Sequence, residues 1–389
     1  MRFEVDSSYI RATLSELISI NSVNPKLIPG APGERQIATC VADRMERLGL
    51  EVRSFEPDQG RVSVLGTRPG SGGGPSLMLN AHYDTVGVEN MLRPFEPRVH
   101  NGRMRGRGAF DMKAGLAASL GAVKALGAAR IDLKGDLLLA AVADEEYASL
   151  GTSDLLNHVS PDAAIVTEPT QLQICVAHKG FIWLEVETLG KAAHGSRVDL
   201  GIDANMKMGH FLAKLSMLEE ALRERTSHPL LGAASLHAAT LAGGSELSAY
   251  AARCRLGIAR RTLPGENAEK AIAEIRAILQ HLESEDPSFK SSLTTLLVRD
   301  PFEVQPDARI VEVVQLAAAA ACDGTPELIG DHPWMDSALL SAAGIETVVI
   351  GPSGRGAHSA EEWVDLESVT HLAEILARSA CTYCKVVTD

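Results

Sequence analysis

The stretch SLMLNAHYD, residues 76–84, shows how the chain is organised. Its first part, residues 76–80, is a nearly continuous apolar run, which is typical of a strand that is buried on both faces. Three other runs have the same character: DLLLAAVA at residues 136–143, AAIVT at 163–167 and ETVVIG at 346–351. Together they predict the strands of a largely parallel sheet.

Helical patterns alternate with these runs at residues 34–48, 112–127, 308–321 and 336–343. A chain that alternates strands and helices folds into an α/β/α sandwich, because each face of the sheet must be covered by helices. We therefore predict that residues 1–179 and 297–389 form one discontinuous α/β domain.

The middle of the chain has a different pattern. Residues 181–188, FIWLEVET, alternate in character, which suits an antiparallel strand with one face in water. The segments that follow predict a helix at 203–225, strands at 235–242 and 251–262, a helix at 265–282 and a strand at 288–298. The order β-α-β-β-α-β is that of a ferredoxin-like α+β unit. We predict an inserted second domain at residues 180–296.

Composition excludes several classes of protein. The 389 residues carry a formal net charge of −13, which argues against nucleic-acid and membrane-surface partners. We found no apolar run of 18 residues, and the start of the chain predicts a charged first helix rather than a signal peptide. The six cysteines are dispersed, so we expect reduced thiols and a cytoplasmic location. Cys381 and Cys384 have the spacing of a zinc or redox pair, but no second pair supports that interpretation.

Histidines and carboxylates follow the predicted strands. His82 and Asp84 follow the first run, Glu145 and Glu146 the second, and Glu168 the third. His358 lies seven residues past the last run, and Asp111 follows a glycine-containing loop, residues 106–110. Each one alone is more often an ordinary loop or surface residue. Because the carboxyl ends of parallel strands meet at one edge of a sheet, we expect them to converge there.

Two histidines among several carboxylates suit zinc or another borderline divalent ion. One carboxylate that bridges two ions about 3.5–4 Å apart would make a two-metal centre. The strand-end residues therefore predict a metal site.

Longer segments carry a resemblance to a known family. They are NAHYDTV (80–86), GRGAFDMKAG (106–115), DEEYASLGT (144–152), VTEP (166–169), KAAHGSRVDLGIDA (191–204) and GAHSAEEWV (356–364). In this order they resemble the M20 metallopeptidase family, which includes acetylornithine deacetylase and succinyl-diaminopimelate desuccinylase. The resemblance implies a zinc-peptidase-like catalytic domain with an inserted dimerisation, or lid, domain.

The resemblance also implies roles for the strand-end residues. His82 and Glu168 would bind one ion, His358 and Glu146 the other, and Asp111 would bridge the two, next to a cis peptide bond at Met112. The ions would be two Zn²⁺, which Co²⁺ or Mn²⁺ could replace. Asp84 would orient His82. Glu145 would move a proton from the attacking water to the leaving amine.

Six residues of the predicted inserted domain, and Trp334 outside it, concern the substrate. By resemblance, His194 would reach the active site of the partner in a homodimer and stabilise an oxyanion. Arg261 would bind the substrate carboxylate, with Arg255 and Arg260 as rivals. Ser248 stands where relatives have Asn, and Ala251 where they have Pro. Trp334 replaces a Gly/Thr-rich stretch, and it either shapes a different pocket or packs on the surface.

These residues predict a dinuclear zinc hydrolase that cleaves the amide bond of a small acylated amino acid. Glu168, a glutamate where aminopeptidases of the family commonly have aspartate, favours N-deacylation. A carboxypeptidase or dipeptidase acting on a short peptide is the alternative, and a non-catalytic metal-binding relative is a third. An oxidoreductase on a doubly wound sheet would need a G-x-G-x-x-G motif after the first strand, and none is present.

Overall fold

The computed structural model describes residues 4–322 and 324–387. Contacts divide the chain into two compact units. Unit 1 comprises Met1–Val176, Val304–Ile329 and Met335–Asp389, and unit 2 comprises Ala177–Glu303 and Gly330–Trp334. The predicted inserted domain, residues 180–296, lies inside unit 2. Residues 1–3 of the predicted first helix lie outside the described residues.

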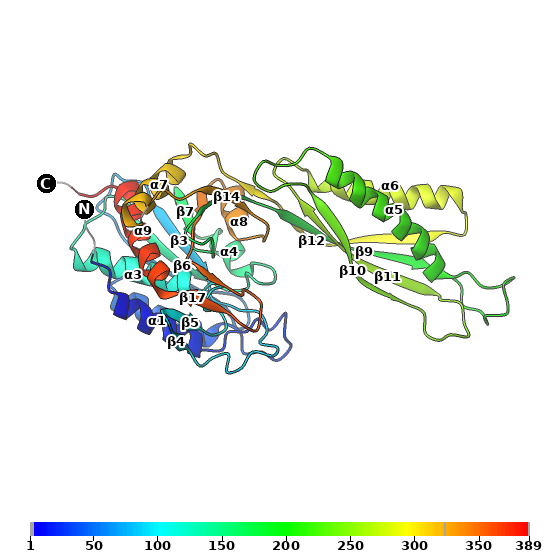
Figure 1. The fold of residues 1–389 in the computed structure, drawn as a ribbon, viewed down its shortest axis with the longest axis horizontal. Helices are drawn as coiled ribbons and strands as arrows, with labels where there is room; N and C mark the ends of the chain where they lie inside the picture. Colours follow the sequence, from blue (N-terminus) through cyan, green and yellow to red (C-terminus); the bar gives the residue numbers. More distant parts are fainter. Residues whose placement is uncertain (1–3, 323, 388–389) are drawn as a thin grey trace. The chain divides into compact units, whose positions relative to one another are not determined.

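Unit 1 contains most of a large mixed sheet (Figure 1). The four predicted strands lie next to one another and run parallel. The strand order is β1 (Glu51–Asp58), β2 (Arg61–Arg68), β6 (Leu137–Val142), β3 (Leu77–His82), β7 (Ala163–Val166), β15 (Glu346–Val349), β8 (Ile174–His178) and β13 (Phe302–Glu303), with β14 (Leu328–Asp331) beside β8. The outer strands are antiparallel to their neighbours, so the sheet is mixed rather than purely parallel.

Helices cover both faces of this sheet. One continuous core joins alternate residues of β3, Leu77, Leu79 and Ala81, to five helices. These are α1 (Ser7–Ser19), α2 (Arg35–Arg47), α3 (Lys113–Ala128), α7 (Arg309–Ala321) and α9 (Leu366–Cys384). The shorter helices α4 (Leu150–Leu155) and α8 (Ser337–Ala342) contact each other, and α4 faces Asn80, the intervening residue of β3. The predicted α/β class is therefore confirmed.

A small antiparallel sheet was not predicted. Its order is β16 (Gly354–Arg355), β17 (Trp363–Asp365), β5 (Arg103–Arg105) and β4 (Arg98–His100). The strands are too short to give a periodic signal. Pairing of β17 with β5 joins two segments that are far apart in the sequence, the one that leads to Asp111 and the one that follows His358.

Unit 2 has the predicted α+β order. It contains β9 (Gly180–Leu189), α5 (Ala204–Glu224), β10 (Ser235–Gly243), β11 (Arg253–Thr262), α6 (Ala268–Glu285) and β12 (Lys290–Arg299). The antiparallel strand order β10-β11-β9-β12 and the two helices are those of a ferredoxin-like unit. The helices cover one face in a separate core, which includes Leu184, Phe211 and Ile275. None of the described helices is both long and apolar enough to span a bilayer.

Candidate active site

The candidate ligands of unit 1 converge at the carboxyl ends of the parallel strands. His82 is the last residue of β3 rather than a loop residue, and Glu168 comes two residues after β7. Glu145 and Glu146 follow β6, and the residue before them, Asp144, has a φ of 70°. This left-handed backbone, uncommon for a non-glycine residue, turns the chain sharply between the strand and the two glutamates.

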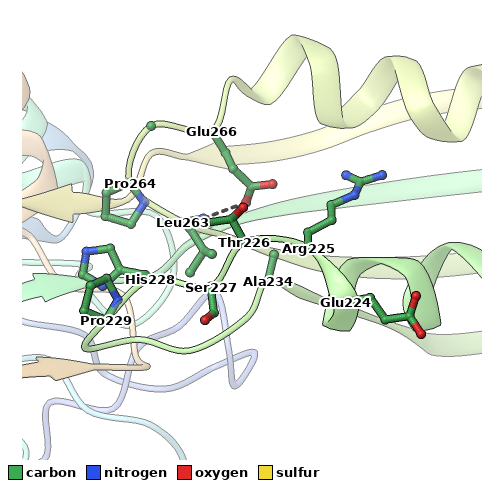
Figure 2. Close-up of a pocket in the computed structure, with 11 residues that line it drawn as sticks. Glu224, Arg225, Thr226, Ser227, His228, Pro229, Ala234, Leu263, Pro264 and Glu266 are labelled. Carbon is green, nitrogen blue, oxygen red and sulfur yellow. Dashed lines mark hydrogen bonds between the residues drawn. The ribbon is translucent and has the colours of Figure 1, made fainter.

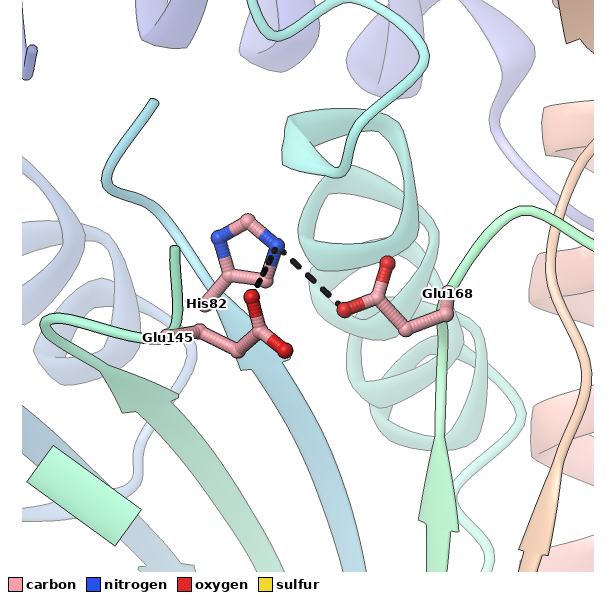
Figure 3. Close-up of side chains that lie close together, drawn as sticks. All are labelled: His82, Glu145 and Glu168. Atoms are coloured by element: carbon pink, nitrogen blue, oxygen red, sulfur yellow. Dashed lines mark ion pairs between the residues drawn. The ribbon is translucent and has the colours of Figure 1, made fainter. Parts of the chain in front are cut away.

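His82 faces three carboxylates. Its Nε2 atom lies 3.3 Å from Asp111 Oδ1, 3.3 Å from Glu168 Oε1 and 3.9 Å from Glu145 Oε2. Figure 3 shows the carboxylates of Glu145 and Glu168, which come from different segments, both pointing at this nitrogen. The imidazole is 1% exposed, and Nε2 has no hydrogen-bond partner. A buried ring nitrogen that has no hydrogen-bond partner and lies among carboxylate oxygens suits a metal ligand.

His358 is the second histidine of the cluster. Its Nε2 atom lies 3.3 Å from Asp111 Oδ2 and 2.9 Å from Glu146 Oε2. Asp111 therefore presents one carboxylate oxygen to each histidine. The side chain of His358 is exposed, its φ is 61°, and the peptide bond between Asp111 and Met112 is cis, as expected.

The electrostatics of this cluster favour a bound cation. Burial raises the pKa of Glu146 to about 7, with the charge of Asp111 acting in the same direction. Burial also raises the pKa of Glu168 to about 7, against the attraction of His82. Carboxylates crowded into a buried space repel one another, and a divalent ion relieves that repulsion. The donor set thus fits the two-metal centre that the sequence predicts.

Asp84 lies directly behind the cluster and is fully buried. Its carboxylate accepts hydrogen bonds from the backbone N–H groups of Glu145, at 3.1 Å, and Glu146, at 3.3 Å. His82 Nδ1 lies 3.1 Å from the backbone carbonyl oxygen of Asp84 and 3.5 Å from its carboxylate. Asp84 thus contacts His82 mainly through its backbone and holds the Glu145–Glu146 loop with its side chain.

Sequence reasoning missed a buried polar network behind Asp84. Asn24 Nδ2 donates to Asp84 Oδ2 at 2.8 Å and to Asp144 Oδ1 at 3.0 Å. Arg61 donates to Asn24 Oδ1 at 3.0 Å and forms 2.6 Å ion pairs with Glu34 and Asp144. These residues come from separate parts of the chain, so no local sequence pattern predicts that their side chains meet.

His194 and Ser248 lie in unit 2, on two segments that pair with each other. His194 bridges Ala249, and the Gly195 N–H donates to the Ser248 carbonyl oxygen at 2.7 Å. His194 is exposed, and its Nδ1 lies 2.8 Å from Ser196 Oγ. Ala251, at the position of the missing proline, is buried, and its carbonyl oxygen accepts the N–H of Ala204 at the start of α5.

Three of the four arginines of β11 are candidates for binding the substrate carboxylate, and they differ in their partners. Arg255 pairs with Glu187 at 3.1 Å, and the buried Arg260 pairs with Glu266 at 2.8 Å. Arg261 stacks on the ring of Phe181 at 5.4 Å, and no ion pair of its guanidinium is found among the described residues. Because the pairing of β11 with β9 is regular, Arg255 and Arg261 point to the same face of the sheet.

Trp334 belongs to an aromatic group in unit 2. Its ring lies 6.2 Å from those of His178 and Phe181, and its indole N–H donates to the Asp300 carbonyl oxygen at 3.0 Å. A separate cavity of about 780 Å³, shown in Figure 2, is lined by eleven residues of the same unit. It lies between the end of α5 and the loop from Leu263 to Glu266, and no candidate site residue is among those that line it.

A family model and known relatives match most of the chain. Residues 78–382 match the family described as Peptidase family M20/M25/M40. N-formyl-4-amino-5-aminomethyl-2-methylpyrimidine deformylase of Bacillus subtilis (strain 168) is 28% identical, over 92% of this chain and 91% of its own. Acetylornithine deacetylase of Pasteurella multocida (strain Pm70) is 26% identical, over 90% and 91%.

Solved structures share the fold. A tripeptidase of Staphylococcus aureus superposes with a TM-score of 0.82 at 19% identity, covering 98% of this chain and 99% of that one. A dinuclear metal-binding M20 peptidase of Bacillus subtilis gives a TM-score of 0.74 at 16% identity, covering 98% and 99%. The chain belongs to peptidase family M20/M25/M40. It is accordingly a hydrolase that acts on amide bonds.

Proposed function

We propose that this chain is a dinuclear zinc hydrolase that removes an acyl group from the nitrogen of a small amino-acid-like molecule. The observation that carries the proposal is the position of Asp111, whose two carboxylate oxygens each lie 3.3 Å from a different histidine. A carboxylate shared in this way is what a bridging ligand between two ions requires.

The residues divide into two ligand sets that meet at Asp111. His82 and Glu168 would hold one ion, and Glu146 and His358 the other. When bound, the ions would polarise the amide carbonyl and lower the pKa of water. His82 Nε2 is free of other hydrogen bonds, which leaves it available as a ligand.

Glu145 acts in this proposal as the general base and then the general acid. Burial raises its pKa well above the ordinary value, against the attraction of His82. A carboxylate with a raised pKa can accept a proton from the attacking water near neutral pH and return it to the leaving amine. Its backbone N–H is held by Asp84 at 3.1 Å, which fixes where the side chain starts.

Arg261, Ser248 and His194 are proposed to contact the substrate. Among the described residues the Arg261 guanidinium has no ion-pair partner, whereas the other arginines of β11 each pair with a glutamate. Arg261 can therefore bind a substrate carboxylate bidentately. Ser248 lies beside the His194 segment. His194 is proposed to donate to the oxyanion in the active site of the partner chain of a homodimer.

N-deacylation is favoured because two of the relatives remove acyl groups from nitrogen: the deformylase by its name and acetylornithine deacetylase likewise. A carboxypeptidase or dipeptidase is the second candidate, since the tripeptidase shows that enzymes with this fold also cleave peptides. Both reactions break an amide bond with the same groups, so only the substrate separates them. We also propose a cytoplasmic location.

A substrate panel on the zinc-loaded enzyme tests the proposal. It should compare N-acetylornithine, N-succinyl-diaminopimelate, N-formyl-4-amino-5-aminomethyl-2-methylpyrimidine, other N-acyl amino acids, dipeptides and tripeptides. We expect the acylated compounds to be hydrolysed faster than the peptides. The metal-free protein is the control and should be inactive until Zn²⁺, Co²⁺ or Mn²⁺ is added. Faster cleavage of peptides would favour the second candidate, and no hydrolysis of any compound would contradict both.

A further inference from the structure

We propose that Arg107 and Glu362 form a positioning pair that sets the distance between the loops carrying Asp111 and His358. This inference rests on the proposed two-metal centre. Neither residue is a candidate ligand, and the sequence pattern predicts a role in the site for neither. Their contacts nevertheless reach the loops that carry two of the candidate ligands, Asp111 and His358.

The Glu362 carboxylate accepts hydrogen bonds from the loop that ends at Asp111. Its Oε1 atom accepts the N–H of Phe110 at 2.8 Å and of Asp111 at 3.1 Å. Its Oε2 atom accepts the N–H of Gly108 at 3.0 Å and Arg107 Nη1 at 2.7 Å. The carboxylate is 1% exposed, so these four donors replace the water it would otherwise bind.

Arg107 connects this carboxylate to two further segments. Its Nη2 donates to the Ser359 carbonyl oxygen at 3.1 Å, next to His358. Its Nε donates to the Gly87 carbonyl oxygen at 3.1 Å, in the segment that follows His82 and Asp84. A planar guanidinium can hold three acceptors in fixed directions, which a lysine ammonium cannot do as rigidly.

The small sheet places the pair. Trp363 of β17 pairs with Arg105 of β5, which brings Glu362 against the loop that follows β5. The Gly106 N–H also donates to the Glu362 carbonyl oxygen, at 3.4 Å. Asp111 and His358 therefore sit on two loops that one sheet and one buried ion pair hold together.

The two ion positions depend on the pair unequally. His82 ends β3 and Glu168 follows β7, so sheet hydrogen bonds support both. His358 lies in a loop and has an exposed side chain, so the hydrogen bond from Arg107 to Ser359 is part of its support. Loss of the pair should weaken the ion between Asp111, Glu146 and His358 more than the ion between His82 and Glu168.

The test is a Zn²⁺ titration of the full chain against a competing chelator. The variant Glu362→Gln keeps the shape of the side chain but turns an amide NH₂ towards donors that need an acceptor. We expect one of the two ions to bind about 10- to 100-fold more weakly, which is the usual effect of removing a group that orients metal ligands. The second ion should change much less. The visible spectrum of the Co²⁺ form should report the same selective loss.

Glu374→Gln is the matched control, because it removes a carboxylate from the ion pair with Arg378 on α9, away from the ligand loops. It should leave both affinities unchanged. If Glu362→Gln fails to fold, Arg107→Lys tests the role of the pair while keeping the charge. We expect it to weaken one of the two ions selectively, but less than Glu362→Gln would.

Several outcomes would overturn the pair's role: wild-type affinities in both Glu362→Gln and Arg107→Lys, equal weakening of the two ions, or the same loss in Glu374→Gln. Failure of the wild-type chain to bind two ions would instead contradict the proposed metal centre.

Discussion

Glu145 is the residue for which a role as metal ligand and a role in proton transfer must be told apart. Its Oε2 lies 3.9 Å from His82 Nε2, so the carboxylate that we propose as the general base also lies among the candidate ligands. Its neighbour Glu146 lies 2.9 Å from His358. The backbone N–H groups of Glu145 and Glu146 both donate to Asp84. These hydrogen bonds set the direction in which each side chain leaves the loop, so that Glu145 faces His82 and Glu146 faces His358.

Replacement of Glu145 by alanine separates a role in proton transfer from a role as metal ligand. We expect kcat to fall by roughly 10²- to 10⁴-fold or more, since proton transfer by a positioned carboxylate contributes about that much. Zinc content should stay near two ions per chain, because all five proposed ligands remain. Metal analysis with steady-state kinetics checks this. A variant that lost zinc together with activity would identify Glu145 as a ligand instead.

Arg261 allows a second test at this scale. Replacement by methionine should lower kcat/KM about 10- to 150-fold for substrates with a carboxylate, because a hydrogen bond to a charged group contributes roughly 1.5–3 kcal/mol. Substrates without the carboxylate should change little. Arg255→Met is the matched control, since Arg255 lies on the same face of β11 but pairs with Glu187. Similar losses in both variants would contradict the assignment.

At the scale of elements, the site depends on polar contacts between segments that no periodicity connects. Arg61 begins β2, Glu34 precedes α2, and Asp144 follows β6. Their side chains meet in a space closed to water, where Arg61 is 3% exposed and Glu34 fully buried. This network supports Asp84 through Asn24, and so it supports the loop that carries Glu145 and Glu146.

Replacement of Arg61 by methionine tests the network. It should lower the free energy of unfolding by roughly 3–5 kcal/mol, because it leaves two buried carboxylates without their cation. Urea unfolding of the metal-free protein measures this. The control is Arg35→Met, which removes an exposed arginine paired with Glu56 and should cost less than about 1 kcal/mol. Equal, small effects would show that the network contributes little to stability.

At the scale of the whole molecule, the candidate chemistry is shared between the two units. The five proposed metal ligands and Glu145 lie in unit 1, whereas His194, Ser248 and Arg261 lie in unit 2. A hydrolase needs the oxyanion donor and the nucleophile at one place. The homodimer in our proposal would supply this by donating His194 from the partner chain.

Mixing two inactive variants tests whether His194 acts in the active site of the partner chain. Glu145→Ala and His194→Ala should each be nearly inactive alone. After denaturation and refolding as a mixture, a mixed dimer would contain one site with both groups intact. Random pairing should then restore about one quarter of the wild-type activity. Absence of any rescue, in dimers whose mixed composition is verified by mass spectrometry, would place His194 in its own chain's site or outside catalysis.

The sequence by itself predicted the elements that follow from periodicity. The apolar runs at β3, β6, β7 and β15 gave the central strands, and the β-α-β-β-α-β order gave the fold of unit 2. Three of the candidate ligands, His82, Glu146 and Glu168, were readable because they follow apolar runs at the carboxyl ends of strands. Asp111 and His358 lie in loops and were expected from the family resemblance. His82 itself closes β3, since the ladder with β6 continues to Val142.

Only the tertiary structure decided which polar groups meet. Arg107 and Glu362 are 255 residues apart, and Asn24 and Asp144 are 120 apart, so no local pattern could pair them. The edge strands and the small sheet were equally unpredictable, because short or half-exposed strands carry little periodic signal. The physical reason is the same in both cases. Apolar burial follows the period of the element, whereas a buried charge must find a specific partner, and that partner is fixed only when distant segments pack together.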